Sequence, residues 1–220
     1  MKKPAHPLQI AVLISGRGSN MHALIRQAGQ YQICLVASNK PAEGLDIADQ
    51  QGIPTGLVSC RDFDSKSSHE AALADAIASS GAEWICLAGY MAVLSAEFIA
   101  RFSGRILNIH PSLLPEYKGL DTHKRALADN QSHHGVSVHL VTPELDDGAV
   151  IAQMQLPVRQ GEDEDSLSRR VLALEHILYP MVVNALASGA LALEQNRVSW
   201  QDKSFGKDLN LPEDGRLIFG

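Results

Sequence analysis

The chain has 220 residues, of which 45% are hydrophobic and 20% charged, with a formal net charge of -6 at pH 7. This length suits one domain with a substantial hydrophobic core. The absence of a basic excess argues against a general nucleic-acid binder or an acidic-membrane binder.

Three features of the sequence bear on its cellular setting. Its three cysteines lack CxxC spacing, which predicts neither a disulfide framework nor a metal site. The apolar run after the first lysines is too brief for a signal sequence. We find no segment approaching the roughly 20 apolar residues of a membrane helix. We therefore expect a cytoplasmic protein with no membrane partner.

Short apolar runs alternate with helical patterns through the first 110 residues. The runs predict strands at 8–15, 33–38, 55–59, 83–89 and 105–110, mostly too apolar to be half exposed. The segments between them predict helices near 19–29, 43–51, 67–80 and 95–102. This alternation indicates βαβ units, so we expect an α/β fold with a mostly parallel central sheet and helices on both faces.

The pattern changes after residue 110. Residues 110–134 form a long irregular connection with a short helix near 122–129, and such connections are usually functional or mobile. Two strands at 135–142 and 149–158 predict an antiparallel hairpin. A long helix is expected to begin near 163–166, because an apolar stripe follows at helical spacing. The stripe contains Leu167, Val171, Leu174, Leu178 and Met181.

The segment "ISGRGSNMHAL", residues 14–24, joins the first predicted strand to the first helix. Exposed N–H groups at a helix start and the positive end of its dipole attract anions. A dinucleotide fingerprint would need a third glycine where this chain has Met21, so a single phosphate is favoured over NAD. An ordinary tight turn with Ser19 as the helix cap is an equally acceptable interpretation of this segment alone.

Polar side chains end the fifth predicted strand. Asn108 and His110 point the same way, because strand side chains repeat every second residue. Ligands of open α/β sheets bind at the carboxyl ends of the strands. An amide beside an imidazole could stabilise an oxyanion and move a proton. Alternatively, the pair satisfies backbone groups around the proline-rich loop.

The acidic turn "ELDDG", residues 144–148, carries Asp146 and Asp147. Acidic residues are common in turns for conformational reasons. A carboxylate facing an imidazole would nevertheless favour the charged imidazolium, an acid usable near neutral pH. Glu175, at the edge of the long helix's apolar stripe, either pairs with a neighbour or holds a substrate amine. The spacing of the histidines matches no zinc pattern, so no metal is expected.

These segments together resemble the glycinamide ribonucleotide formyltransferase family of folate-dependent enzymes. The matching stretches are "LISGRGSN", "LAGYMAVLS", "RILNIHPSLLPEYKGLDTH", "HGVSVHLVTPELDDG" and "LEHILYP". The resemblance implies a Rossmann-like formyltransferase fold. It also implies one catalytic domain over 1–203, with a phosphate-binding half of about 1–107 and a folate and catalytic half of about 108–203. Residues 204–220 are expected to form a weakly ordered tail.

The resemblance also implies roles for particular residues. Asn108, His110 and Asp146 would be catalytic in formyl transfer from 10-formyltetrahydrofolate, the co-substrate, to the amine of glycinamide ribonucleotide. The ribonucleotide would contact Gly18, Ser19, Asn20, Leu172 and Glu175. The folate would contact Lys66, Met91, Ala92, Val93, Leu94, Asn108, Thr142, Pro143, Glu144, Leu145 and Asp146.

Two departures from the family pattern concern binding. Relatives often have a basic residue where this chain has Ala92, and Lys66 would partly substitute at the folate tail. Relatives can carry a polar residue where this chain has Leu172. The expected partners are these small molecules, with no nucleic acid, and the protein would be a monomer or a homodimer.

Two other functions are weighed against formyl transfer. One is hydrolysis of formyltetrahydrofolate, which would not need the "GRGSN" loop or Glu175. The other is a nucleotide-binding module without turnover, in which Asn108, His110 and Asp146 would be dispensable. The joint presence of all three residues argues against that module.

Overall fold

The protein is described by a computed structural model that covers the chain except residues 1–5, 195–196, 203–205, 207–208, 210 and 213. It contains two compact units, Met1–Asn108, called unit 1, and Ile109–Gly220, called unit 2. The strand β5, Ile106–His110, runs from the first unit into the second. The functional division into halves 1–107 and 108–203 stays a prediction.

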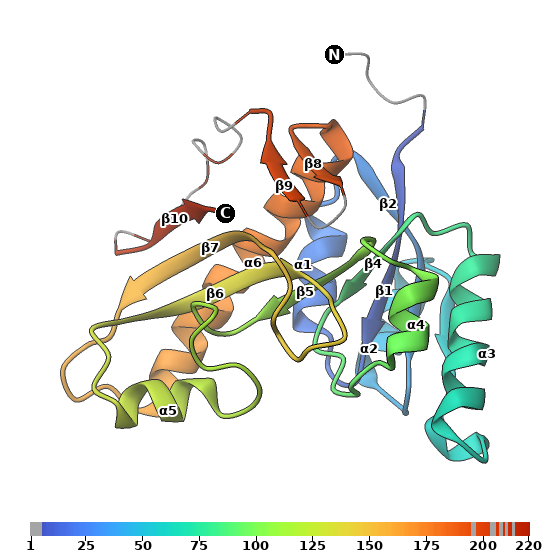
Figure 1. Cartoon of the computed structure of the whole chain (residues 1–220), viewed down its shortest axis with the longest axis horizontal. Coiled ribbons are helices and arrows are strands. Elements are labelled where there is room, and N and C mark those ends of the chain that lie inside the picture. The colour runs from blue at the N-terminus through green and yellow to red at the C-terminus, as the bar shows by residue number, and fades with distance from the viewer. Residues whose placement is uncertain (1–5, 195–196, 203–205, 207–208, 210, 213) are drawn as a thin grey trace. The chain divides into compact units, whose positions relative to one another are not determined.

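Unit 1 is a parallel sheet connected by helices (Figure 1). Its strands are β1 Leu8–Ile14, β2 Tyr31–Ser38, β3 Thr55–Leu57, β4 Trp84–Leu87 and the first part of β5. Its helices are α1 Ser19–Arg26, α2 Glu43–Gln50, the 3-10 turn η1 Cys60–Asp62, α3 Lys66–Ser79 and α4 Ala96–Arg101. The strand order is β3-β2-β1-β4-β5, and every neighbouring pair is parallel.

The centre of this sheet is covered on both faces. Five consecutive residues of β1, from Ile10 to Ile14, are fully buried although their side chains alternate between the two faces. Continuous burial of this kind is typical of a parallel sheet packed between helices. The predicted α/β class and the order of its elements are therefore confirmed.

Unit 2 is built on antiparallel strands and one long helix. Its elements are α5 Thr122–Ala128, β6 His133–Leu140, β7 Val150–Pro157, α6 Glu164–Ser188, β8 Leu191–Glu194, β9 Arg197–Trp200 and β10 Arg216–Phe219. The strands β6 and β7 form the predicted hairpin, and β10 pairs with the other edge of β7. The strands β8 and β9 form a separate two-stranded sheet.

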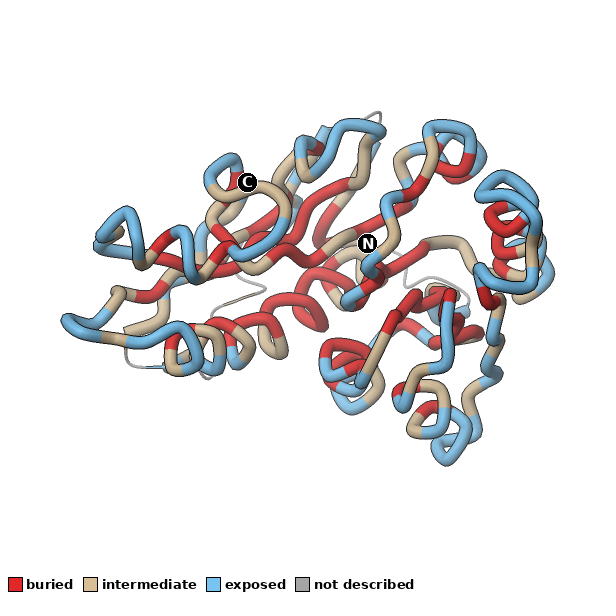
Figure 2. The backbone as a smooth tube through the Cα atoms, turned by 90° about the horizontal axis from the view of Figure 1, so that it is seen from below, coloured by how far each residue is buried: buried red, intermediate tan, exposed pale blue. Residues whose placement is uncertain are grey.

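Helix α6 supplies much of the core of unit 2. The predicted stripe is confirmed, since Leu167, Val171, Leu174 and Leu178 are fully buried and Met181 is 4% exposed. The helix begins where expected, because the Asp163 side chain accepts a hydrogen bond from the Ser166 backbone N–H at 2.7 Å. Figure 2 shows burial along the whole backbone, with strands and inner helix faces mostly buried and loops mostly exposed.

Two expectations about the second half need correction. By length and composition α6 could cross a membrane, although no such segment was expected, and 61% of its apolar window is buried within the protein as in a core helix. The tail was expected to be weakly ordered, yet Arg216–Phe219 forms β10. Its alternate residues Leu217 and Phe219 are half-buried, and Phe219 packs edge-on against Trp200 at 4.7 Å between ring centroids.

Candidate active site

The loop between β1 and α1 exposes backbone donors at a helix start. Gly18 precedes the helix with φ 73°, a left-handed conformation that favours glycine, and Ser19 is the first helical residue. Ser19 is therefore not the helix cap, and no side chain in the described part of the chain caps α1. The first-turn N–H groups remain suited to an anion.

A second helix holds this loop in place. The Gly44 backbone N–H at the start of α2 donates to the Gly16 carbonyl at 3.2 Å. A Cβ on Gly44 would lie 2.6 Å from Ile14 Cδ1 and 3.1 Å from the Gly16 oxygen. Only glycine permits this close approach, so the loop geometry depends on Gly44 as well as Gly18.

The strand order places this loop where α/β sheets bind ligands. From β1 the chain proceeds to β2 and β3 on one side, whereas β4 and β5 lie on the other side. The direction of winding thus reverses between β1 and β4, and open α/β sheets bind ligands outside the carboxyl ends at such a switch point. The two loops that leave this point are 15–18 and 88–95.

Strand β5 carries the first two predicted catalytic residues. Asn108 pairs with Leu87 of β4 in the parallel ladder and is half-buried. His110, two residues later and on the same face of the strand, is 6% exposed. The expectation that one strand end presents an amide and an imidazole is therefore met by the strand's register.

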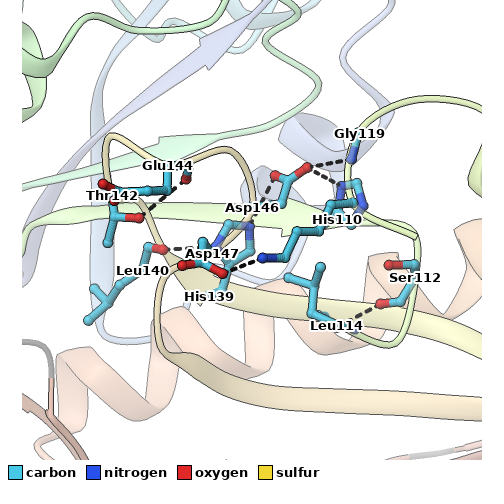
Figure 3. A network of polar contacts seen from close by, with 12 residues as sticks. His110, Ser112, Leu114, Gly119, His139, Leu140, Thr142, Glu144, Asp146 and Asp147 are labelled. Carbon is cyan, nitrogen blue, oxygen red and sulfur yellow. Dashed lines mark hydrogen bonds and ion pairs between the residues drawn. The ribbon is translucent and has the colours of Figure 1, made fainter. Parts of the chain in front are cut away.

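In unit 2, His110 and Asp146 are brought together as predicted (Figure 3). His110 Nδ1 lies 3.5 Å from Asp146 Oδ2, and both side chains are less than a tenth exposed. On the other side of the ring, His110 Nε2 lies 3.0 Å from the Tyr117 carbonyl oxygen, which can only accept. Both nitrogens thus face acceptors, an arrangement that accommodates the doubly protonated imidazolium.

The Asp146 carboxylate is held by its own turn and by the loop after β5. Asp146 has φ 49°, a left-handed conformation that is uncommon outside glycine but tolerated by aspartate. Its Oδ2 accepts a hydrogen bond from the Gly119 N–H at 2.9 Å. Its neighbour Asp147 forms an ion pair with Lys118 of the same loop. Two consecutive aspartates therefore contact one loop with different partners.

A second imidazole lies beside this carboxylate. His139 Nε2 is 3.7 Å from Asp146 Oδ1, while its Nδ1 lies 2.8 Å from the Leu140 carbonyl (Figure 3). Burial lowers the pKa of His139, and the Leu140 carbonyl and Asp146 only partly oppose that effect. His139 is consequently a neutral ring at neutral pH, packed against the carboxylate that faces His110.

Two further histidines, one in α5 and one at the start of β6, contact each other. His134 Nε2 is 3.1 Å from His123 Nδ1, so one ring donates to the other. Burial, followed by the charge of His123, lowers the pKa of His134 to about 4. Burial, followed by the charge of His110, also lowers the pKa of His123. Near neutral pH both rings are uncharged.

The loop between β5 and α5 is fixed by several side chains. Arg125 Nη1 donates to the carbonyls of Lys118 and Leu120 at 2.7 and 3.0 Å. Its guanidinium also stacks over the Tyr117 ring at 5.2 Å. The buried Ser137 hydroxyl, on β6, donates to the Ser112 carbonyl at 2.6 Å. The carbonyl that meets His110 is therefore held from both ends of its loop.

The remaining predicted binding residues divide between the two units. In unit 1, Lys66 is the exposed first residue of α3, and Met91 to Leu94 form the loop after β4. In unit 2, Thr142 to Asp146 form the turn between β6 and β7, while Glu175 is 8% exposed on α6 and Leu172 is half-buried. Their roles toward substrates stay predictions.

Several contacts were not predicted. The Tyr117 carbonyl, the Gly119 N–H, the Lys118–Asp147 pair and the His123–His134 pair all depend on how the irregular loop folds back. No pattern in the residues indicates them, although the concentration of histidines in 110–139 is visible in the sequence. In the described ranges, no group of three or more His, Cys, Asp or Glu side chains is arranged to hold a metal ion.

Comparison with known proteins identifies the family. A protein-family model described as formyl transferase matches residues 8–183. The phosphoribosylglycinamide formyltransferase of Escherichia coli (strain K12) is 43% identical over 200 residues, which make up 89% of this chain and 94% of that protein. The trifunctional purine biosynthetic protein adenosine-3 of Drosophila pseudoobscura pseudoobscura is 41% identical over 91% of this chain, which spans 15% of that protein.

A solved structure gives the same result. The structure of the phosphoribosylglycinamide formyltransferase from Coxiella burnetii superposes with a TM-score of 0.84 at 43% identity, covering 89% of this chain and 94% of that one. Sequence and fold therefore agree over most of the chain. The family match at 8–183 spans the loop after β1, the strand β5 and the turn that carries Asp146. The chain belongs to the formyl transferase family.

Proposed function

We propose that this chain transfers the formyl group of 10-formyltetrahydrofolate to the amine of glycinamide ribonucleotide, a reaction of purine biosynthesis. The products are formylglycinamide ribonucleotide and tetrahydrofolate. Membership of the formyl transferase family and the names of its relatives support this activity. The observation that carries the mechanism is the 3.5 Å approach of the Asp146 carboxylate to His110.

The reaction proceeds by direct transfer. The amine nitrogen bonds to the formyl carbon, and the carbonyl oxygen becomes the oxyanion of a tetrahedral intermediate. Collapse of the intermediate breaks the bond between the formyl carbon and N10 of the folate. The proton lost by the amine is balanced by the proton gained at N10. A catalyst must therefore stabilise the oxyanion and move one proton.

Three side chains have the chemistry for these tasks. The Asn108 amide donates a hydrogen bond to the oxyanion, and the His110 imidazolium stabilises it and supplies a proton. Asp146 faces His110 Nδ1 at 3.5 Å, where it orients the ring and relays protons through water. Its contact with the Gly119 N–H and its left-handed backbone support a fixed orientation of the carboxylate.

Substrate binding follows the same proposal. The ribonucleotide phosphate binds the backbone of Gly18, Ser19 and Asn20, its amine is held by Glu175, and Leu172 supplies an apolar contact. The pterin contacts the loop Met91–Leu94 and the turn Thr142–Asp146, and the folate tail reaches Lys66. Placing both substrates together can remove roughly 7–11 kcal/mol of the barrier.

A turnover assay tests the function. The purified protein receives 10-formyltetrahydrofolate with and without glycinamide ribonucleotide, and tetrahydrofolate formation is followed. Product that requires the ribonucleotide is expected. Product at an equal rate without it would replace transfer by hydrolysis of the folate, and no product under either condition would contradict catalysis of both kinds.

The setting of the reaction belongs to the same proposal. We expect the protein to act in the cytosol on the two small-molecule substrates of the proposed reaction. Its predicted state is a monomer or a homodimer. Light scattering during gel filtration would measure the mass against the 23.8 kDa of one chain.

A further inference from the structure

The loop between β4 and α4 presents apolar side chains outward. Met91 and Val93 are 70% and 61% exposed, whereas their neighbours Tyr90 and Leu94 are 9% and 6% exposed. Large exposed apolar side chains that lie close together in the chain are a feature of ligand-binding surfaces. Exposure of apolar side chains to water is unfavourable. A loop that keeps them exposed is therefore held in place by other contacts.

The first end of this loop is held by Ser15, the residue that follows β1. The Ser15 N–H donates to the Gly89 carbonyl at 3.2 Å, which continues the ladder between β1 and β4. The Ser15 hydroxyl then accepts a hydrogen bond from the Met91 N–H at 2.9 Å. The hydroxyl thus takes the place of a strand carbonyl where the segments after β1 and β4 diverge. This is the point at which the winding direction of the sheet reverses.

The Ser15 hydroxyl is itself oriented by a third strand end. Its proton is donated to Asn39 Oδ1 at 2.7 Å, and both side chains are less than a tenth exposed. With the proton committed to Asn39, a lone pair faces the Met91 N–H. Ser15 therefore joins the ends of β2, β1 and β4 through hydrogen bonds of its own hydroxyl and backbone.

The second end of the loop is held by Glu70 of α3. Glu70 is 6% exposed, and its Oε1 accepts a hydrogen bond from the Ser95 N–H at 3.0 Å. Ser95 in turn caps α4, because its hydroxyl accepts from the Phe98 N–H at 3.1 Å. The carboxylate also pairs with Lys66 at 3.7 Å on the outer side of α3. A charged acceptor makes the Ser95 contact stronger than a neutral one would be.

We propose that Ser15 and Glu70 are positioning residues for the formyl-folate site, because their hydrogen bonds hold the two ends of the apolar loop 91–95. This inference rests on the proposed function, in which that loop contacts the pterin. Neither side chain touches the reacting atoms. Ser15 is also the first residue of the loop 15–18, which leads to the proposed phosphate site. Loss of its hydroxyl therefore weakens the binding of both substrates, whereas loss of the Glu70 carboxylate weakens the binding of the folate alone.

Glu70 allows a matched pair of variants on the full-length chain. Glu70→Met keeps the size of the side chain and removes the acceptor, whereas Glu70→Gln keeps an acceptor oxygen. The Kd of 10-formyltetrahydrofolate, measured by titration without an amine substrate, is expected to rise about tenfold for Glu70→Met and less than threefold for Glu70→Gln. The Kd of glycinamide ribonucleotide is expected to stay within twofold.

Ser15 allows an independent test. Ser15→Ala is expected to weaken both the folate and the ribonucleotide about tenfold, because it removes the hydroxyl that accepts from the Met91 N–H and donates to the buried Asn39 side chain. Tyr90→Phe is the control in the same loop, since no described residue hydrogen-bonds the buried Tyr90 hydroxyl. This control should leave the folate Kd unchanged. If Glu70→Met does not fold, Ser15→Ala, which removes only a hydroxyl, decides the inference.

Hydrogen exchange separates positioning from stability. The Met91 amide in Ser15→Ala and the Ser95 amide in Glu70→Met should exchange faster than in the unchanged chain. Faster exchange with an unchanged folate Kd would overturn the inference and leave two structural hydrogen bonds. Equal loss of folate and ribonucleotide binding in Glu70→Met would also overturn it.

The outcome does not depend on turnover. If the unchanged chain binds the folate but gives no ribonucleotide-dependent product, the proposed function fails while the binding series still decides the role of both residues. If the unchanged chain does not bind the folate, the inference fails with it. Normal turnover together with an unchanged folate Kd in Ser15→Ala and Glu70→Met would contradict the inference and leave the proposed function intact.

Discussion

The loop after β1 in unit 1 and the His110 region in unit 2 solve different problems with different chemical groups. The loop offers backbone N–H groups at the start of α1, and its shape depends on Gly18 and Gly44. The His110 region offers imidazoles and a carboxylate, and its shape depends on side-chain contacts with a folded-back loop. One region is suited to a fixed charge and the other to a moving proton.

This contrast predicts how each region tolerates substitution. A backbone site loses its geometry when a Cβ is added to a glycine, but it loses little when an exposed side chain is shortened. A proton-transfer site depends on single atoms, so even an isosteric change at the right position removes most of its activity. We expect the contrast between single side-chain atoms and backbone or exposed groups to hold in both units, from the largest effect to the smallest.

The largest effect is expected from Asp146→Asn. The amide keeps the size of the side chain and can still accept from Gly119, but it no longer carries the charge that faces His110. Ribonucleotide-dependent turnover should fall about 10³-fold, equivalent to roughly 4 kcal/mol, with the folate Kd within a few fold. Steady-state kinetics measures the turnover, and titration of the protein with the folate measures the Kd. Turnover within tenfold of the unchanged chain would remove Asp146 from the mechanism.

The next effect concerns stability and contrasts a buried ion cluster with an exposed pair. In unit 2, Arg170 contacts Glu162 at 2.8 Å and Asp214 at 2.7 Å, and the Glu162 side chain is 2% exposed. Arg170→Met leaves the Glu162 carboxylate buried without its positive partner and should lower the free energy of unfolding by about 3 kcal/mol.

The matched control lies in unit 1. Arg101 pairs with Asp75 at 2.7 Å, but both side chains are more than two-fifths exposed. Arg101→Met should cost less than about 1 kcal/mol. Urea unfolding monitored by circular dichroism measures both variants. Equal losses would show that burial does not set the difference.

The sequence alone predicted the regular elements well, because their signals are local. Apolar runs located the five parallel strands of unit 1, and helical spacing located α6 and its buried stripe. Strands β8, β9 and β10 were missed because each has four residues with mixed polarity and no long apolar run. Their pairing partners, rather than their own residues, determine that they are strands.

The candidate site divides in the same way. Asn108 and His110 could be predicted from one strand end, and Asp146 from the resemblance of its turn to a family. The contacts of Tyr117 and Gly119 could not be predicted, because they are backbone groups without a sequence signature. The Ser15 link to Met91 and Asn39 was also missed, since it joins three strand ends that only the sheet order brings together.

A pH dependence of stability is expected from the buried histidines of unit 2. The pKa of His134 is lowered to about 4 by burial and by His123, whereas an unfolded histidine titrates near 6.5. The unfolded state therefore binds the proton first as pH falls. Stability that is present above pH 6.5 is lost between about 6.5 and 4, at up to about 1.4 kcal/mol per pH unit.

His134→Gln checks this origin, because the amide can hydrogen-bond without titrating. The free energy of unfolding of this variant should depend less steeply on pH between 6.5 and 4.5, a window above the titration of Glu162 and Asp214, whose pKa values are lowered. Parallel curves for the variant and the unchanged chain would assign the slope to other groups.

The backbone site of unit 1 is tested by Gly18→Ala. Gly18 has φ 73°, and an added Cβ would lie 3.1 Å from Met21 Cε and 3.3 Å from the Gly44 Cα. The strained loop should bind glycinamide ribonucleotide about tenfold less tightly and the folate unchanged. Ser19→Ala, at an exposed position, should cost less than Gly18→Ala. Calorimetric titration measures each Kd, and a larger loss in Ser19→Ala would favour side-chain over backbone recognition.

The smallest effect is expected one residue from the largest. Asp147 pairs with Lys118, but their side chains are 54% and 35% exposed, so solvent screens the pair. Asp147→Asn should therefore change the free energy of unfolding and the activation free energy by less than about 1 kcal/mol each. Comparison with Asp146→Asn in the same assays isolates the group that faces His110, because the two changes are chemically identical. A loss of turnover as large as that of Asp146→Asn would mean that the Lys118 contact holds the loop over His110, and the charge of Asp146 alone would no longer account for the activity.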